Sequence, residues 1–312
     1  MRTADLTAPY ASGDGRILAV VGHGFIGRRV AHAALASGWK VRSLSRQPAA
    51  APTEPGHDLL VGDARQPDLV LELLTGVDHV VFAAGTAKPA ESNQHPVHEI
   101  AANLSPLLAV LNAIPRTSVG AITLLSSGGT VYGPDAPTPT PETAPLWPIN
   151  AYGVLKVASE RYVAMHAGLH GVSADILRCA NVYGPGEPTH GSQGLIGVAR
   201  TAIRARRPVV VFGDGSARRD FVHVDDLADV VVALAARPDG IRVLNVGSGC
   251  SASVRDVIEA VATSLGMEAV LEHRPGRPTD VPVVELDVSA LRAVIGFEPR
   301  DLATGLGPSP AV

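Results

Sequence analysis

Short apolar runs alternate with amphipathic segments along the first 180 residues of the chain. A short apolar run is typical of a buried strand, whereas apolar residues spaced three and four apart are typical of a helix. Strands are therefore expected at residues 17–21, 40–44, 59–61, 79–83, 121–125 and 174–178. Helices are expected at residues 28–36, 67–74, 97–114 and 151–168. This alternation predicts an α/β protein with a doubly wound parallel sheet, in which ligands bind at the carboxyl ends of the strands.

Beyond residue 180 the alternation loosens. The pattern predicts a basic helix at 194–206, a strand at 208–212, a polar charged loop at 213–226, a strand at 241–246, a helix at 253–265 and a basic loop at 274–280. The arginine-bearing loops are typical of a small lobe that covers a substrate, because a guanidinium binds phosphate through two parallel hydrogen bonds.

Composition and charge narrow the class of protein. Hydrophobic residues make up 46% of the 312 residues but aromatic residues only 4%, a mixture that suits a parallel sheet buried on both faces. A formal net charge of −4 gives no support for binding nucleic acid. Only two cysteines are present, so we expect a reducing, cytoplasmic location. No apolar run is long enough to predict a membrane span, and no Cys/His spacing predicts a metal site.

A glycine-rich turn follows the first expected strand, with the sequence Gly22-His-Gly24-Phe25-Ile26-Gly27. Glycines at these positions let the backbone approach a pyrophosphate, and the N-terminus of the next helix supplies hydrogen-bond donors. The strand–turn–helix–strand order predicts a Rossmann dinucleotide-binding domain over residues 16–180, to which the strand at 241–246 returns. Residues 181–312 are then expected to form mainly a smaller substrate-binding lobe, and residues 1–15 a disordered leader.

The end of the second expected strand bears on the choice of cofactor. A carboxylate there binds the adenosine ribose diol, whereas an arginine accommodates a 2′-phosphate. This strand ends in Ser45-Arg46 and has no acid, which favours NADP.

Tyr152 and Lys156 are four residues apart in an expected helix, so they lie on one face, one turn apart. A phenol ionises with a pKa of about 10, so a phenolate base near neutrality needs roughly 4 kcal/mol of stabilisation. An ammonium about 4 Å away provides about that amount at an effective dielectric constant of 20. The pair therefore predicts an acid–base site for hydride-transfer chemistry, with the dinucleotide turn upstream of it.

Taken together, the chain resembles the extended short-chain dehydrogenase/reductase family of the NAD-dependent epimerase/dehydratase type, in particular its sugar-nucleotide epimerases of the UDP-glucose 4-epimerase kind. The matching stretches cover residues 20–30, 62–85, 91–104, 126–133, 148–156, 177–186, 213–231, 244–249 and 274–280. They occur in the order and spacing of the family and span most of residues 17–300.

The resemblance implies roles for individual residues. Tyr152 would be the general acid or base on the sugar hydroxyl, assisted by Lys156, and both would also contact the cofactor. Other cofactor contacts are implied for Gly22, Gly24, Phe25, Ile26, Gly27, Ser45, Arg46, Asp63, Ala64, Ala83, Ala84, Gly85, Asn103 and Ser126. The diphosphate part of a sugar nucleotide would be held by Asn181, Arg219 and Arg277. A homodimer formed through the helices at 97–114 and 151–168 is also implied.

Three positions depart from the family pattern. Val21 replaces the leading glycine of the turn, and Ser45-Arg46 replaces the acid that is typical of NAD binding. The catalytic serine or threonine of the family lies four residues before the tyrosine of the VYG run, and that position here is Gly128. Ser127 and Thr130 are the candidates to replace its hydroxyl, and Ser127 is also expected to contact the substrate.

Our leading hypothesis is a sugar-nucleotide 4-epimerase, of UDP-hexoses in particular, that uses transient hydride transfer to a bound nicotinamide. The alternative is an NADPH-dependent 4-ketoreductase of a 4-keto-6-deoxy sugar nucleotide, which Ser45-Arg46 favours. An epimerase favours NAD as the cofactor, and a reductase favours NADP. A dehydratase is disfavoured, since no pair of carboxylates lies beside residues 126–132. A third hypothesis is a catalytically silent NADP-binding protein, and the only observation that favours it is the glycine at position 128 in place of the catalytic hydroxyl.

Overall fold

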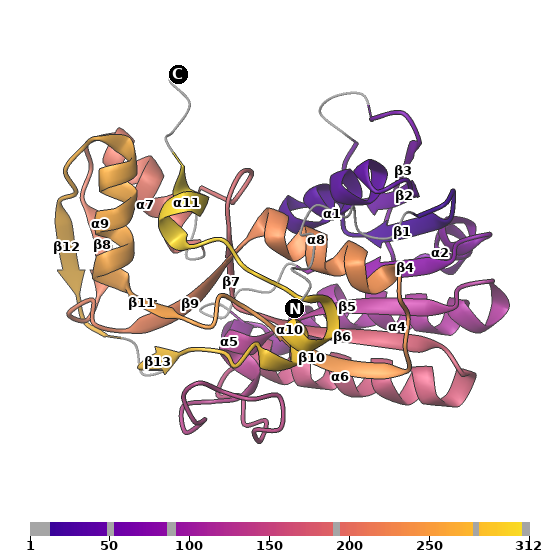
Figure 1. Ribbon diagram of the computed structural model, residues 1–312. Helices are drawn as coiled ribbons and strands as arrows, with labels where there is room; N and C mark the ends of the chain where they lie inside the picture. The colour runs from indigo at the N-terminus through magenta and orange to yellow at the C-terminus, as the bar shows by residue number, and fades with distance from the viewer. Residues whose placement is uncertain (1–12, 49–52, 86–91, 190–193, 277–280, 308–312) are drawn as a thin grey trace, which may run out of the picture.

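A seven-stranded parallel sheet forms the centre of the protein in the computed structural model, which describes residues 13–48, 53–85, 92–189, 194–276 and 281–307. Its strands are β1 (Ile17–Val21), β2 (Lys40–Ser45), β3 (His57–Val61), β4 (His79–Phe82), β5 (Ala121–Ser127), β6 (Ser173–Cys179) and β10 (Ile241–Val246). Their order is β10-β6-β5-β4-β1-β2-β3 (Figure 1). The predicted doubly wound α/β fold is confirmed.

The strand order reverses beside β1. Val21 at the end of β1 pairs with Leu44 on one side and with Phe82 on the other. The chain therefore leaves β1 toward β2 and later returns to β4 on its opposite side. This reversal opens a crevice at the carboxyl ends of the strands, which is where open α/β sheets bind ligands.

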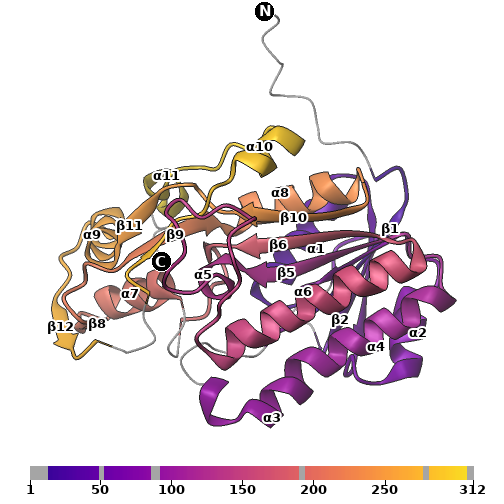
Figure 2. The same cartoon turned by 90° about the horizontal axis from the view of Figure 1, so that it is seen from below.

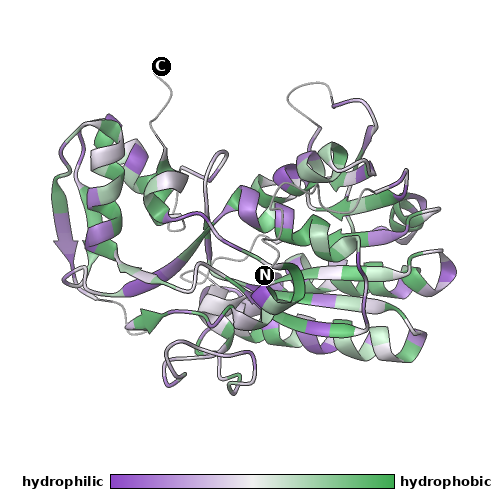
Figure 3. Cartoon of the chain, in the orientation of Figure 1, coloured by the Kyte–Doolittle hydropathy of each residue, from purple (hydrophilic) through white to green (hydrophobic). Residues whose placement is uncertain are grey.

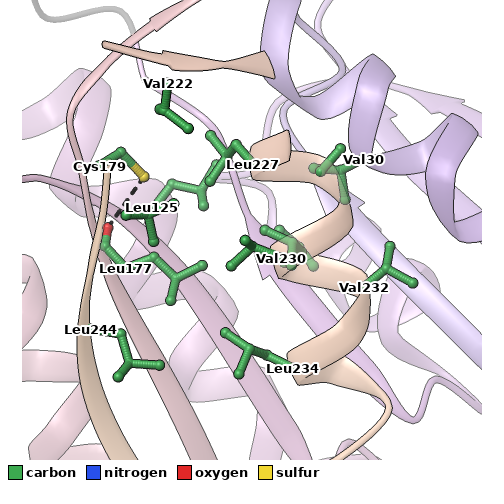
Figure 4. Packing of buried hydrophobic residues seen from close by; sticks show 14 of the residues in the cluster. Val30, Leu125, Leu177, Cys179, Val222, Leu227, Val230, Val232, Leu234 and Leu244 are labelled. Atoms are coloured by element: carbon green, nitrogen blue, oxygen red, sulfur yellow. Dashed lines mark hydrogen bonds between the residues drawn. The ribbon is translucent and has the colours of Figure 1, made fainter. Parts of the chain in front are cut away.

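Helices cover both faces of this sheet. Helices α1 (Phe25–Ala36) and α8 (Val224–Ala235) pack on one face, whereas α2 (Pro67–Leu74), α4 (Ser105–Ala113) and α6 (Ala151–His170) pack on the other (Figure 2). Helix α8 is buried almost all round because it packs against the sheet, against α1 beside it and against the C-terminal segment. Figure 4 shows Leu227, Val230 and Leu234 of α8 packing toward Leu177 and Leu244 of the strands.

The helix predicted at 97–114 is not a single α-helix. It consists of α3 (Pro96–Glu99), the π-helical turn η2 (Ile100–Leu104), α4 and the 3₁₀ turn η3 (Ile114–Arg116). The segment Pro96–Arg116 is long and apolar enough to span a membrane by length and composition alone. Its second half instead packs in the core, where Leu107 and Val110 are fully buried. The π turn contains Asn103, consistent with the frequent occurrence of π turns at functional sites.

A smaller lobe, which has its own apolar core, covers the carboxyl edge of the sheet. Its elements are β7 (Asn181–Tyr183), α7 (Leu195–Arg204), β8 (Val209–Phe212), β9 (Arg218–His223), β11 (Ser251–Ser253), α9 (Val254–Leu265), β12 (Leu271–Arg274), β13 (Val283–Val284) and α11 (Leu302–Leu306). Figure 3 shows hydrophobic and hydrophilic residues alternating along α9. Its apolar side packs Val257 and Val261 against Ile196 and Ile203 of α7. Helix α10 (Ser289–Ile295) packs back against α8 and β10.

The prediction of a loop at residues 213–226 is wrong. This segment contains strand β9, which pairs with β7, β11 and β13. The strand was not predicted because its first three residues are charged. Asp220 is fully buried, and its carboxylate accepts hydrogen bonds from the backbone amides of Ser248, Gly249 and Leu286. A buried carboxylate satisfied in this way is compatible with a central strand, although the sequence alone reads as polar.

Candidate active site

The glycine turn after β1 has the close packing that a dinucleotide site requires. Gly22 has φ 101°, and a Cβ added to it would lie 2.5 Å from the backbone nitrogen of Ala84. A Cβ on Gly27 would lie 1.9 Å from the carbonyl oxygen of Gly22. Gly24 precedes α1 and offers no side-chain cap, so the first amides of the helix stay available to an anion. These residues fit the pyrophosphate of NAD or NADP.

Helix α6 begins in a tightly fixed turn that carries Tyr152. Asn150 caps the helix, its side-chain oxygen accepting the amide of Gly153 at 2.8 Å. The amide of Tyr152 donates to the hydroxyl of Ser92 at 3.1 Å, and Ser92 lies in the short turn η1 (Ser92–Gln94). Capping by asparagine is worth about 1 kcal/mol, and here it also fixes the direction in which the tyrosine leaves the helix.

Tyr152 and Lys156 lie together, as their spacing predicted. The Lys156 ammonium is 5.6 Å from the centre of the Tyr152 ring and donates a hydrogen bond of 2.8 Å to the carbonyl oxygen of Leu125 in β5. The lysine is therefore held between the end of β5 and the tyrosine. A positive charge this near a phenol ring is of the kind that stabilises a phenolate.

The position of the expected catalytic hydroxyl is closed by packing. A Cβ on Gly128 would lie 2.6 Å from Cδ1 of Leu286 and 3.0 Å from the carbonyl oxygen of Arg178. Real Cβ atoms essentially never approach other atoms within 3.0 Å, so a serine or threonine would force Leu286 to move. A hydroxyl-bearing side chain at this position therefore requires a rearrangement of Leu286.

The neighbouring hydroxyls have different surroundings. Ser126 donates to the Glu160 carboxylate at 2.5 Å, so its hydroxyl is already engaged. Ser127 is the last residue of β5 and lines the main cavity. Thr130 lines the same cavity, and its buried hydroxyl has no hydrogen-bond partner among the residues that the structure describes.

A buried ion pair lies behind this site. Arg178 of β6 binds Glu160 of α6 at 2.7 Å, and their side chains are 6% and 4% exposed. Arg178 also donates to the hydroxyl of Tyr132, which in turn donates to Asn245 at 2.6 Å. Burial raises the pKa of Tyr132. Tyr132, the tyrosine of the VYG run, thus belongs to the supporting network and not to the cavity.

A cavity of about 630 Å³ lies between the edge of the sheet and the lobe, and most of the predicted site residues line it. The predicted residues that line it are Gly24, Phe25, Ile26, Gly27, Ala83, Ala84, Gly85, Asn103, Ser126, Ser127, Thr130, Tyr152, Lys156, Asn181 and Arg219. The predicted residues that do not line it are Gly22, Ser45, Arg46, Asp63 and Ala64. Those five lie in β2 or just after β1, β2 and β3. Arg277 lies outside the described residues.

The lobe contributes residues that the sequence did not reveal. Val211, Phe212 and Phe221 give the cavity an apolar wall. Glu187 is the only carboxylate among the described lining residues, and burial raises its pKa to about 7. No motif marks Glu187, because its surroundings arise only when the residues of α7 fold over it.

The chain is similar to known proteins of one enzyme family. Residues 18–247 match the model of the NAD dependent epimerase/dehydratase family. UDP-glucose 4-epimerase of Mycolicibacterium smegmatis is 33% identical over 77% of this chain and 79% of its own length. dTDP-6-deoxy-L-talose 4-dehydrogenase (NAD(P)⁺) of Kitasatospora kifunensis is 31% identical over 95% of this chain and 94% of its own length.

A solved structure is similar over nearly the whole chain. It is the UDP-glucose 4-epimerase of Thermotoga maritima with UDP-glucose, which has a TM-score of 0.88 and 27% identity and covers 94% of this chain and 97% of its own length. The glycine cradle, the Tyr152–Lys156 pair and these relatives agree on an NAD- or NADP-dependent enzyme of sugar nucleotides. The chain belongs to the NAD-dependent epimerase/dehydratase family, a group of the extended short-chain dehydrogenase/reductase type.

Proposed function

We propose that the protein is a 4-epimerase of nucleotide-diphosphate sugars, with UDP-hexoses as the preferred class. The observation that carries this proposal is the meeting of Tyr152, Lys156 and Ser127 in one cavity that also reaches Arg219 of the lobe. The relatives named UDP-glucose 4-epimerase support the choice of reaction and nucleotide.

The residues around Tyr152 account for proton transfer. The Tyr152 phenolate accepts the proton of the sugar 4-hydroxyl and later returns it to the 4-keto oxygen. Lys156 stabilises the phenolate, and its bond to Leu125 keeps the ammonium in place throughout. The hydroxyl of Ser127 donates to the same sugar oxygen as charge develops on it. The bound nicotinamide supplies the reversible hydride acceptor, so no external oxidant is consumed.

Inversion at C4 requires the sugar to present both faces while the nucleotide stays fixed. Asn181 and Arg219 lie on the lobe side of the cavity, away from Tyr152 on the sheet side. We assign them to the diphosphate, because a guanidinium binds phosphate through two hydrogen bonds. The sugar can then rotate beside Tyr152 without release of the nucleotide.

A second function is supported by a separate observation. Ser45 and Arg46 follow the pattern expected for NADP, and a relative of this chain is named as a dehydrogenase that uses NAD(P)⁺. The same tyrosine and lysine would then serve an NADPH-dependent 4-ketoreductase of a 4-keto-6-deoxy sugar nucleotide, with net consumption of NADPH.

We also propose a homodimer. Helices α3 to α4 and α6 lie side by side (Figure 2). Both segments carry exposed apolar side chains. These are Val97, Ile100, Val154, Met165 and Leu169, each about half exposed or more. Apolar faces of this kind on adjacent helices are typical of an interface between subunits.

The reaction itself separates the two functions. The enzyme is incubated with UDP-glucose or UDP-galactose and a catalytic amount of nicotinamide cofactor, and inversion at C4 is followed by proton NMR. Epimerisation without net change in cofactor absorbance supports the proposal. Stoichiometric oxidation of NADPH with a 4-keto-6-deoxy sugar nucleotide, and no inversion, would instead establish the reductase.

A variant pair tests the role of the tyrosine. Tyr152→Phe is expected to reduce turnover by at least about 100-fold, the lower end of what a positioned acid–base group contributes. Tyr162→Phe is the matched control, because Tyr162 lies on the same helix with its side chain exposed. Near-normal turnover in Tyr152→Phe would refute the mechanism.

A further inference from the structure

Three residues of helix α6 follow one another at intervals of one turn. Tyr152 and Lys156 belong to the proposed site, and Glu160 comes four residues after Lys156, so it continues the same face of the helix. Glu160 is not among the described residues that line the cavity, and its side chain is only 4% exposed. A carboxylate that is removed from water needs partners for its charge. The partners of Glu160 connect it to the strand ends that carry the site.

The first partner lies at the end of β5. Ser126 donates its hydroxyl hydrogen to Oε1 of Glu160 at 2.5 Å. The residue before it, Leu125, accepts the hydrogen bond of the Lys156 ammonium at 2.8 Å, and the residue after it is Ser127. Two successive residues of β5 are thus bound to two successive turns of α6. This double attachment limits how far Ser127 can move relative to the helix.

The second partner lies at the end of β6. Arg178 is the neighbour of Ser126 across the sheet. Its guanidinium binds both oxygens of Glu160, with Nη2 at 2.7 Å from Oε2 and Nε at 3.1 Å from Oε1. Glu160 therefore holds the ends of two neighbouring strands to one helix. A pair with two parallel bonds fixes orientation as well as distance, so the positions of the two strand ends are coupled.

Arg178 also holds the short helix α5 (Gly128–Val131), which follows β5 directly. The carbonyl oxygen of Arg178 lies 3.0 Å from the ideal Cβ position of Gly128, at the start of α5. Nη1 of Arg178 donates to the hydroxyl of Tyr132 at 3.0 Å, just after the end of α5. This helix is thus contacted at both ends by an arginine whose charge Glu160 balances.

We propose that Glu160 is a positioning residue, which sets the distance between Tyr152 on α6 and the hydroxyl of Ser127 on β5 from behind the cavity. The inference rests on the proposed function, because it concerns the reaction in which those two residues take part. A hydroxyl stabilises developing charge only if it points to the place where that charge forms. A displacement of about 1 Å in such a site can lower the rate about 100-fold. Since the lobe holds the nucleotide, the effect should be on kcat and not on KM.

Glu160→Gln keeps the size of the side chain and removes its charge. We expect kcat for UDP-glucose to fall about 10- to 100-fold, with KM within about 3-fold of that of the unaltered protein. Asp175→Asn is the matched control. Asp175 forms a similar, largely buried pair with Arg242, with Oδ1 at 2.6 Å from Nε, near the start of β6 and away from the site. Both changes leave an arginine without its carboxylate, but only Glu160→Gln should lower kcat.

Variants of Ser126 test the link to β5 while the ion pair stays intact. Ser126→Ala should lower kcat about 10-fold, and Ser126→Thr, which keeps the hydroxyl, should stay within about 3-fold of the unaltered protein. Ser126→Ala combined with Glu160→Gln should lose no more than Glu160→Gln alone, because both changes break the same bond. All rates are compared at a temperature at which circular dichroism shows every variant to be folded.

The outcomes separate this inference from the proposed function. Equal kcat in Glu160→Gln and Asp175→Asn, a loss confined to KM, or independent effects of the two changes in the double variant overturn the positioning role and leave the proposed function standing. If Glu160→Gln does not fold, the Ser126 variants decide, and normal kcat in Ser126→Ala overturns the role. An unaltered protein that turns over neither UDP-glucose nor a 4-keto-6-deoxy sugar nucleotide overturns the proposed function, and the positioning role with it.

Discussion

Leu286 fills the space that a side chain at Gly128 would need, its Cδ1 lying 2.6 Å from the ideal Cβ position. The two residues are far apart in the sequence but meet behind the end of β5. Gly128→Ser should therefore destabilise the protein by about 1–3 kcal/mol, the usual cost of overpacking a core. Urea denaturation of the variant measures this cost.

A compensating change tests the cause. Leu286→Ala alone creates a cavity, whereas Gly128→Ser together with Leu286→Ala should lose less stability than the sum of the two single changes. Strict additivity in this double-mutant cycle would mean that the two positions do not compete for space.

The catalytic hydroxyl is expected to come from Ser127. Ser127→Ala should lower kcat by at least about 10-fold with little change in KM, because the bond to the sugar oxygen strengthens as charge develops. Thr130→Val keeps the shape of the side chain and removes a hydroxyl that has no hydrogen-bond partner within the described parts of the chain, so it should leave kcat within about 3-fold. If instead Thr130→Val carries the large loss, the two assignments must be exchanged.

The buried pair of Arg178 and Glu160 should be costly to break. Arg178→Met leaves the Glu160 carboxylate buried and unpaired, for which we expect a loss of about 3–5 kcal/mol in the free energy of unfolding. The double change Arg178→Met with Glu160→Gln removes both charges and should recover part of that loss. An equal loss in the single and double variants, measured by urea denaturation, would contradict this account.

Glu187 should make stability depend on pH. Its pKa is raised from 4.5 to about 7 in the folded protein, so the folded state holds a proton that the unfolded chain releases earlier. Stability should therefore fall as the pH rises from about 4.5 to about 7, by about 1–3 kcal/mol.

Glu187→Gln should remove this dependence. Thermal unfolding at pH 5 and pH 8 should show a smaller difference between the two conditions in the variant than in the unaltered protein. Glu259→Gln is the control, because Glu259 is exposed on α9 and should leave the difference as it is. An undiminished difference in Glu187→Gln would assign the pH dependence to another group.

Helices and strands whose apolar residues follow one clear period could be predicted from the sequence. Strands β1 and β10 have the bounds that their apolar runs predicted, and Tyr152 and Lys156 meet because helical spacing alone brings them together. Strand β9 was missed because the partners of Asp220 lie 28 to 66 residues away. The π turn around Asn103 was missed because its apolar pattern resembles that of an α-helix.

The residues of the candidate site likewise fall into those that local sequence predicts and those that it does not. Residues of the glycine turn and of α6 follow from local sequence, since their geometry is set within a few residues. The closure of Gly128 by Leu286 and the burial of Glu187 depend on packing between distant segments, which no local pattern encodes.

Strand β9 has a consequence for the proposed diphosphate site. Asp220 is fixed inside by backbone amides, and successive side chains of a strand point to opposite sides, so Arg219 is directed into the cavity. Its orientation is set during folding, before any ligand arrives. A pre-organised guanidinium loses less conformational entropy on binding than one on a free loop. The affinity for a diphosphate should therefore depend on Asp220, although its carboxylate lies buried behind the strand.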